Sequence, residues 1–160
     1  MHKANPRFAT LPEALRHWTA ESEDALLYIQ TADGETEQSR VSRGEFEIRA
    51  RAVAAELQAH HAEGERAVLL YPPGLDYVAG FFGCLYAGAI AVPAYPPDPS
   101  RLNRTLPRLQ AIVADCRADI VLTTSEILAM AQFLFEQAPE LKSKRWIATD
   151  TIPDAQASSY

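Results

Sequence analysis

Residues 71–97 read Tyr-Pro-Pro-Gly-Leu-Asp-Tyr-Val-Ala-Gly-Phe-Phe-Gly-Cys-Leu-Tyr-Ala-Gly-Ala-Ile-Ala-Val-Pro-Ala-Tyr-Pro-Pro, and this stretch decides the fold of the chain. The part from Tyr77 to Val92 is uncharged. It therefore fits either a transmembrane helix or a helix and a strand buried in an α/β domain. A membrane-spanning helix needs about 20 apolar residues. This part is shorter, and Pro93 stops a helix directly after it, so the buried helix and strand are favoured.

The same stretch divides into three elements. Leu, Tyr, Phe and Cys side chains occupy every face of a helix from about Leu75 to Tyr86, which predicts burial nearly all round. A turn at Ala87-Gly88 and a short strand from Ala89 to Val92 follow. A proline-rich loop then runs from Pro93 to Pro99.

Composition limits the class of protein. A chain of 160 residues has the usual size of one domain. The net charge of −6 argues against a nucleic-acid-binding protein, which normally carries a basic stripe. Cys84 and Cys116 lie in apolar helical contexts and indicate reduced, buried thiols. Since no apolar signal segment follows the N-terminal residues, we expect a cytoplasmic protein without a transmembrane segment.

The first forty residues predict a helix and a hairpin. Thr10-Leu-Pro-Glu13 has the form of a capping box and opens a helix to about Ala20. Leu26 to Thr31 is short and β-prone, Ala32-Asp-Gly34 supplies a turn, and Glu35 to Val41 returns as a partner strand. We therefore expect a small N-terminal hairpin.

From Ser42 onward, helices alternate with strands. Ser42-Arg-Gly-Glu45 is a second capping box, and its helix ends before Gly64, which suits a left-handed position. The expected strands are Ala67–Tyr71, Ala89–Val92, Asp119–Thr123 and Arg145–Thr149. The later helices are Asn103–Cys116 and Ile127–Gln137, the last opened by a capping box at Thr123-Thr-Ser-Glu126. This order predicts an α/β fold, a mainly parallel sheet flanked by helices, with residues 150–160 as a ragged tail.

Ligands of such sheets bind at the carboxyl ends of the strands. The segments at these ends are Tyr71–Gly74, Pro93–Pro97 and Thr123–Ser125. Gly74 opens a helix whose free N–H groups can hold an anion, although a plain turn explains the same residues. No P-loop and no G-x-G-x-x-G sequence is present.

Three arginines form a second candidate site. Arg101, Arg104 and Arg108 share one helix face through spacings of three and four residues. This face fits a phosphate or an acidic partner. A solvated face, or pairing with Asp98 and Asp115, is the alternative interpretation.

No residue pattern predicts catalysis or metal binding. His60 and His61 lie at the end of a helix, where the dipole favours a cation, and a surface position explains them. His2 and His17 have no Cys, Asp or Glu partners at metal-ligand spacing. No hydroxyl lies in a G-x-S-x-G sequence. Burial of Cys84 raises the pKa of its thiol and makes it inert. We therefore assign no catalytic residue and no metal ligand.

Two sequence segments resemble motifs of a known family. Val41-Ser-Arg-Gly-Glu-Phe46 and Cys84-Leu-Tyr-Ala-Gly-Ala-Ile-Ala-Val-Pro93 resemble the first two core motifs of the adenylate-forming superfamily, the AMP-dependent synthetases and ligases. The continuation from Ala94 to Asp115 resembles one branch, the fatty acyl-AMP ligases. The resemblance runs from about Thr10 to Thr149.

The resemblance implies the first portion of the N-terminal domain of an enzyme that activates fatty acids with ATP and Mg²⁺. The acyl group of the acyl adenylate then passes to the phosphopantetheine thiol of an acyl carrier protein, and AMP leaves. It also implies that Tyr71, Pro72, Phe81 and Tyr95 line or support an acyl pocket, with ordinary packing as the alternative. The family's phosphate loop, adenine and ribose residues and C-terminal catalytic lysine match no position here.

Several expectations follow from this partial match. The 160 residues alone should be inactive and should bind ATP and Mg²⁺ poorly. A fragment of a fatty acyl-CoA synthetase, or a non-catalytic binding or docking module, are the alternative functions. Uncovered sheet edges and apolar helix faces predict self-association.

Overall fold

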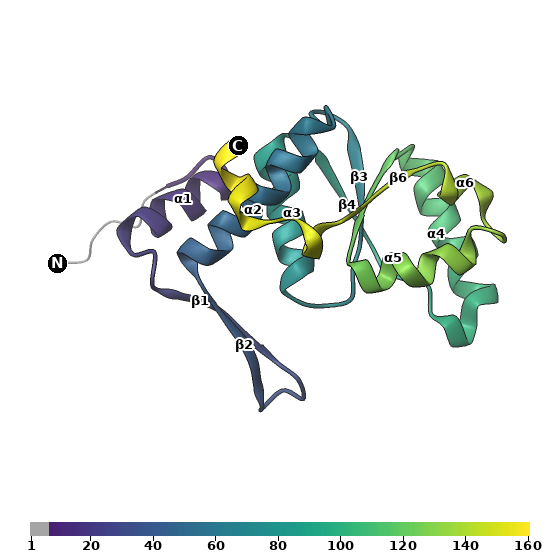
Figure 1. Cartoon of the computed structure of the whole chain (residues 1–160), viewed down its shortest axis with the longest axis horizontal. Helices are drawn as coiled ribbons and strands as arrows, with labels where there is room; N and C mark the ends of the chain where they lie inside the picture. The colour runs from purple at the N-terminus through teal and green to yellow at the C-terminus, as the bar shows by residue number, and fades with distance from the viewer. Residues whose placement is uncertain (1–6) are drawn as a thin grey trace. The chain divides into compact units, whose positions relative to one another are not determined.

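The structure is a computed structural model that describes residues 7–160 (Figure 1). The chain divides into two compact units, one ending at Ile48 and the other beginning at Arg49. In the described part of the chain, no helix combines the length and the apolar character that crossing a membrane requires. The transmembrane interpretation of residues 71–97 therefore fails.

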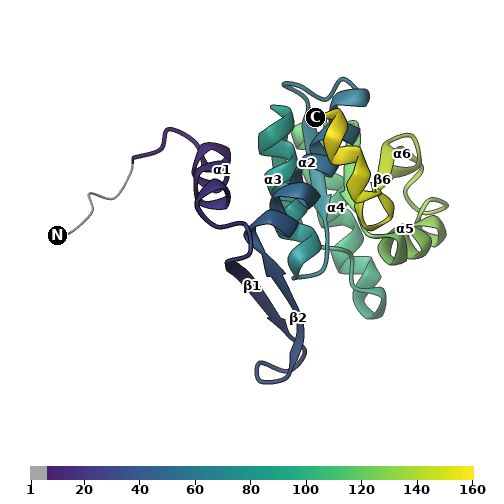
Figure 2. The same cartoon turned by 60° about the vertical axis from the view of Figure 1, so that its left-hand side comes forward.

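The first unit contains the expected helix and hairpin. Helix α1 spans Leu11–Glu21, and Thr10 Oγ1 accepts the N–H of Glu13 at 3.2 Å, as the capping box predicts. Strands β1 (Leu26–Thr31) and β2 (Glu37–Ser42) pair antiparallel, and Figure 2 shows them side by side as a two-stranded ribbon. The predicted hairpin is confirmed.

Helix α2, Arg43–Ala59, crosses the boundary between the units. Its capping box is reciprocal, because Ser42 N–H donates to Glu45 Oε2 at 2.8 Å and Glu45 N–H donates to Ser42 Oγ at 3.2 Å. The helix ends earlier than the glycine suggested. His61 has a φ of 55° just past its end, and Gly64 has a φ of 74° in the turn that leads to the next strand.

The second unit is built on a four-stranded parallel sheet in the order β4-β3-β5-β6. Its strands are β3 (Arg66–Leu70), β4 (Ile90–Ala94), β5 (Ile120–Thr123) and β6 (Arg145–Ala148). Every residue of the central strand β5 is buried. The α/β fold with a parallel sheet is thereby confirmed.

Strand β4 continues two residues beyond its predicted end and includes Pro93, which pairs in register with Leu69. Proline lacks an N–H donor, and sheets tolerate it in edge strands, where that position faces away from the neighbouring strand. Strand β4 is such an edge strand. The proline therefore did not end the strand.

Helices cover both faces of the sheet. Figure 1 shows helix α3 (Leu75–Ala87) on one face, with α4 (Leu102–Cys116), α5 (Ser125–Ala131) and α6 (Pro139–Lys142) on the other. This division follows from right-handed crossovers, because the chain reverses its direction across the sheet after β4. Short 3₁₀ turns join the elements: η1 Pro99–Arg101, η2 Gln132–Leu134, η3 Thr149–Thr151 and η4 Asp154–Ser159.

Helix α3 packs closely through its glycines. A Cβ atom on Gly83 would lie 2.5 Å from Val53 Cγ1, and one on Gly80 would lie 2.7 Å from the hydroxyl oxygen of Tyr71. The expectation of burial all round is wrong, because Tyr77, Phe81 and other residues of the same helix are only half-buried.

Two boundary predictions near the end of the chain are also wrong. Thr124, not Thr123, caps helix α5, and its hydroxyl accepts the N–H of Ile127. The tail is not ragged, since its last residues form η3 and η4 and bury Ile152 and Ala157. Its order rests on polar contacts with α2, with Thr123 of β5 and with Tyr71, which a local reading of polar residues does not reveal.

We predict that Gly83→Ala lowers the free energy of unfolding by about 1–2 kcal/mol. The new methyl group would overlap Val53, and overpacking costs about 1–3 kcal/mol, whereas alanine in a helix recovers only about 1 kcal/mol. Urea denaturation measures the change. The double variant Gly83→Ala/Val53→Ala should lose less stability than the sum of the losses of the two single variants. Wild-type stability in Gly83→Ala would contradict the close packing.

Candidate functional site

A chain of hydroxyl groups joins the carboxyl ends of three neighbouring strands. Thr123 Oγ1 donates to the carbonyl of Leu70 at 2.7 Å, and Thr149 Oγ1 donates to the carbonyl of Thr123 at 3.2 Å. Since this bond uses the Thr149 hydrogen, Tyr71 donates its own to Thr149 Oγ1 across 2.9 Å. All three side chains are buried. The network fixes the edge at which parallel sheets bind ligands.

Tyr71 is a neutral, structural phenol in this network. Its residue is 2% exposed, and burial raises the pKa of its hydroxyl far above the ordinary tyrosine value. The ring also lies edge-to-face with Tyr77, with ring centroids 6.5 Å apart. Tyr71 therefore supports the sheet edge and takes no charge at physiological pH.

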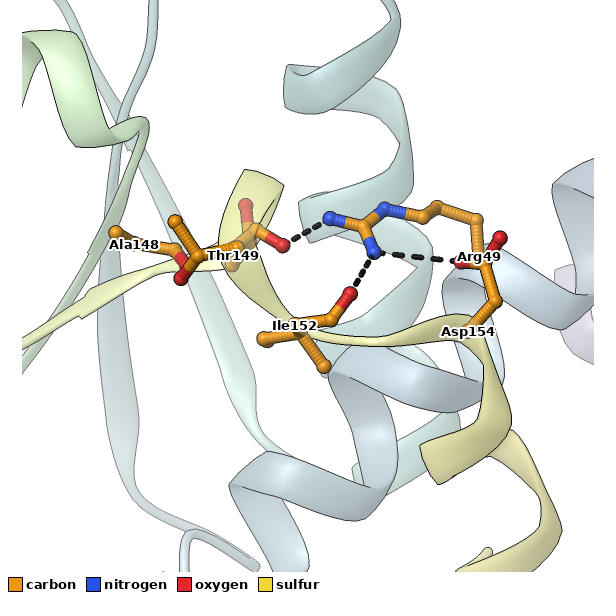
Figure 3. A network of polar contacts seen from close by, with 6 residues as sticks. Arg49, Ala148, Thr149, Ile152 and Asp154 are labelled. Atoms are coloured by element: carbon orange, nitrogen blue, oxygen red, sulfur yellow. Dashed lines mark hydrogen bonds and ion pairs between the residues drawn. The ribbon is translucent and has the colours of Figure 1, made fainter.

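Arg49 of α2 binds the segment that follows β6 (Figure 3). One of its terminal nitrogens, Nη1, donates to the carbonyl of Ile152 at 2.6 Å, while Nη2 donates to the carbonyl of Thr149. Asp154 completes the group as an ion pair at 3.4 Å. Only 21% of the Arg49 side chain is exposed, so these bonds form in a partly desolvated setting. They explain why the tail is ordered.

Two further carboxylates, Asp76 and Asp150, lie at the carboxyl edge of the sheet. Asp150 Oδ1 accepts the N–H of Ser125 at 2.8 Å, and Asp150 Oδ2 accepts the Ser125 hydroxyl at 2.6 Å. Desolvation raises the pKa of Asp76 at the start of α3, the negative charge of Asp150 raises it further, and Arg49 opposes both effects. Among the described residues, no three His, Cys, Asp or Glu side chains form a group that could hold a metal ion.

The four residues predicted for an acyl pocket do not meet in one cavity. Tyr71 is buried under Gly80, Pro72 is exposed, and Phe81 lies half-buried beside Phe82. Tyr95 is 75% exposed. Their assignment to an acyl pocket stays a prediction.

An apolar cavity of about 300 Å³ opens elsewhere, on the sheet face covered by α4, α5 and α6. The proline-rich loop, α4, η2 and Trp146 of β6 contribute to its wall, and none of the lining residues is charged. Members of the wall are Leu70, Pro97, Leu102, Ile127, Met130 and Leu134. In the sequence, the apolar residues between 127 and 135 are the pattern that could have indicated this cavity. The sequence does not show that they face the proline-rich loop.

The three arginines lie on the exposed surface of α4 and its preceding turn. Through their side chains, Arg101, Arg104 and Arg108 form no hydrogen bond and no ion pair with another described residue, although the backbone N–H of Arg101 donates to the carbonyl of Asp98 at 3.0 Å. Gln110, on the opposite flank of α4, donates to Glu140 of α6 at 2.6 Å. Helical spacing thus places the arginines on the flank turned away from α6.

Asp98 does not neutralise this flank. Its Oδ1 accepts the N–H and the hydroxyl of Ser100, which are the main reasons why the pKa of Asp98 is lowered. The charge of Arg101 adds a smaller effect. Near a helix N-terminus, the helix dipole also opposes positive charge. Arg101 at the N-cap and Arg104 in the first turn of α4 are therefore kept at some cost to helix stability, whereas Arg108 lies beyond this turn.

The prediction that Cys84 is a buried, inert thiol is confirmed. Its side chain is fully buried, and burial raises the pKa of the thiol to about 12. Cys116 is also a free thiol and is partly exposed. Of the histidines, His60 lies within 3.1 Å of Glu56 on α2, and His2 falls outside the described residues. No nucleophile with an adjacent base emerges from this part of the chain.

Comparison with known proteins gives one family match and several close relatives. The family model described as "AMP-binding enzyme" matches residues 15–159. A medium-chain fatty acid–acyl carrier protein ligase, JamA of Moorena producens, is 42% identical over 98% of this chain and 27% of its own length. Disco-interacting protein 2 homolog B-A of Danio rerio is 35% identical over 93% of this chain and 10% of its own.

Among solved structures, a fatty acyl-adenylate ligase from L. pneumophila, in complex with acyl adenylate and pyrophosphate, superposes with a TM-score of 0.79. It is 31% identical, and the match covers 96% of this chain and 25% of that one. The chain thus spans about a quarter of the length of the ligases that it matches.

We predict that Arg49→Ala lowers the free energy of unfolding by about 2–3 kcal/mol, because two carbonyl groups lose a charged donor. Arg49→Lys should lower the free energy of unfolding by less than Arg49→Ala does. The ammonium group keeps the charge, but it lacks the planar geometry with which a guanidinium donates two hydrogen bonds. Guanidinium denaturation and limited proteolysis after residue 148 measure both effects.

The matched control is Arg40→Ala, because Arg40 is 65% exposed and pairs with Glu37 on the hairpin. An exposed pair contributes at most about 1 kcal/mol. Equal losses for Arg40→Ala and Arg49→Ala would contradict the role of Arg49.

Proposed function

Since this chain belongs to the AMP-binding enzyme family, we propose that it is the opening part of a ligase that activates fatty acids as acyl adenylates. The observation that carries the proposal is the 42% identity to a fatty acid–acyl carrier protein ligase over nearly all of this chain. The likeness to a fatty acyl-adenylate ligase supports the same substrate class. A cytoplasmic location stays a prediction from the sequence.

In the complete enzyme, the fatty acid carboxylate would attack the α-phosphorus of ATP, forming the acyl adenylate and releasing pyrophosphate. Magnesium would offset the charge of the phosphates. The described residues do not fit the phosphates of ATP or a magnesium ion. No Gly-Lys-Ser/Thr sequence is present, and the carboxylates form no metal-binding group in the described chain. We therefore derive no catalytic step from these residues.

The contribution of this chain is a scaffold. The hydroxyl network of Tyr71, Thr123 and Thr149 fixes the carboxyl edge of the sheet, and Arg49 fixes the segment that leaves β6. In the proposed enzyme, this rigid edge would support the residues that bind the substrates. Tyr71, Pro72, Phe81 and Tyr95 remain the proposed supports of the acyl pocket.

We propose an acyl carrier protein as the acceptor of the acyl group, rather than coenzyme A. The similarity to JamA, a ligase named for the acyl carrier protein, supports this choice. On this chain, the flank of Arg101, Arg104 and Arg108 offers three exposed cations whose side chains form no ion pair among the described residues, which suits an acidic protein surface. We propose that this flank contacts the carrier protein.

A non-catalytic binding module is the second candidate function. The similarity to Disco-interacting protein 2 homolog B-A favours it, because that relative is named for an interaction and not for a reaction. The two candidate functions are distinguished by placing this chain in a known ligase and measuring the activity of the chimera.

We predict that this chain can replace the matching quarter of JamA and support fatty-acid-dependent ATP–pyrophosphate exchange. The 160 residues alone should give background exchange, because they lack a nucleotide site. Background exchange from a folded chimera would favour the binding module. The acceptor is tested in the same chimera by comparing transfer to a carrier protein with transfer to coenzyme A, and a preference for coenzyme A would favour a fatty acyl-CoA synthetase.

We predict that Arg104→Glu in this chimera lowers kcat/KM for the carrier protein about fivefold, since an exposed ion pair contributes up to about 1 kcal/mol. Adenylate formation should not change. Lys142→Glu is the control, because it makes the same change in charge at another exposed helical site. An equal loss in both variants would mean that only net charge matters.

A further inference from the structure

A partly buried histidine lies between a carboxylate and a guanidinium just past the C-terminal end of α2. His60 Nε2 lies 3.1 Å from Oε1 of Glu56, one helical turn earlier. On the other side of the ring, His60 Nδ1 contacts Nη1 of Arg145, the first residue of β6. The side chains of His60 and Glu56 are 29% and 27% exposed, so a plain surface position does not explain them.

These contacts determine which ring nitrogen carries the hydrogen. A guanidinium has only N–H donors, so Nδ1 of His60 is the acceptor and carries no hydrogen. The hydrogen of the neutral ring then lies on Nε2, which donates it to Glu56. The second carboxylate oxygen, Glu56 Oε2, accepts the side-chain amide N–H of Gln156 at 2.6 Å. The neutral imidazole therefore completes a hydrogen-bonded chain from β6 through α2 to η4.

Water reaches this histidine through an open pocket of about 550 Å³. The charged or titratable residues in its wall are Glu56, His60 and Arg145. The neighbouring cation Lys144 is bound to Asp119 at 2.9 Å. The ring can therefore exchange a proton with solvent, and one carboxylate and one guanidinium respond to its charge.

Protonation of the ring affects its two contacts in opposite ways. A proton added at Nδ1 would face the N–H donors of Arg145, so that an attractive contact becomes a repulsive contact between two cations. At Nε2, the hydrogen bond to Glu56 becomes charge-assisted and therefore stronger. The bond from Gln156 to Glu56 does not involve this proton. Protonation thus removes the contact with Arg145 and keeps the others.

We propose that His60 is a proton-controlled switch between α2 and the edge strand β6. The neutral ring holds Arg145, whereas the protonated ring keeps Glu56 and releases Arg145 into the open pocket. Histidine side chains ordinarily change charge between about pH 5 and pH 8, so moderate acidification operates the switch. All the side chains involved belong to this chain, and the switch does not depend on the proposed function.

Nitrogen-15 NMR of the chain, labelled at its histidine rings, tests the tautomer. At about pH 8, where a histidine is ordinarily neutral, His60 should show a bare Nδ1 and a protonated Nε2. The spectrum of His60→Gln, in which the signals of this ring are missing, assigns them. A hydrogen on Nδ1 at this pH would overturn the proposal.

The stability of Arg145→Met tests the release, because methionine keeps an unbranched side chain without charge or donors. The loss of a hydrogen bond should lower the folding equilibrium constant about fivefold at about pH 8, but less than about twofold at about pH 5.5. The contact contributes stability while the ring is neutral, and this contribution is lost as the pH falls. Urea denaturation at both pH values measures the change.

The matched control is Arg66→Met, because Arg66 is also the exposed first residue of a strand in the same sheet. Its effect should be equal at the two pH values. In a His60→Phe background, Arg145→Met should also lose its pH dependence, since the accepting ring nitrogen is absent.

Equal losses in Arg145→Met at both pH values, or the same pH dependence in Arg66→Met, would overturn the switch. If Arg145→Met does not fold, the NMR spectrum of the parent decides alone, because a bare Nδ1 is what the contact with Arg145 requires.

Discussion

The hydroxyl network at the carboxyl edge of the sheet is the constraint on which the second unit depends. Thr123 binds the end of β3, Thr149 binds the end of β5, and Tyr71 binds Thr149. Tyr71 in turn sets the depth at which α3 can pack, because its ring leaves no room for a side chain at Gly80. Loss of one partner would leave buried polar groups unpaired, so the network acts as a unit.

The sequence predicted much of this architecture because its signals are local. The capping boxes at Thr10 and Ser42 depend on residues three apart, and both form as expected. The alternation of helices and buried strands predicted the parallel sheet. At Thr123 the local signal failed, because its hydroxyl binds Leu70 and leaves Thr124 to cap the helix. That competition involves a residue 53 positions away in the chain.

The candidate site was less predictable, because its residues come together only through the fold. The ordered tail depends on Arg49, which lies 100 or more positions before the carbonyl groups that it binds. The apolar cavity joins the proline-rich loop to residues near 130 and to Trp146. The arginine flank was visible from spacing alone, since it lies on one helix. Its acidic partner stays a proposal.

Pro93 in the edge strand β4 bears on how this chain behaves at high concentration. The position of its missing N–H faces outward, so a strand that tried to add to this edge would find a gap in the row of donors. Sheet growth from one molecule to the next is thereby hindered at the border where it would begin. At this edge, Pro93 therefore acts against strand addition.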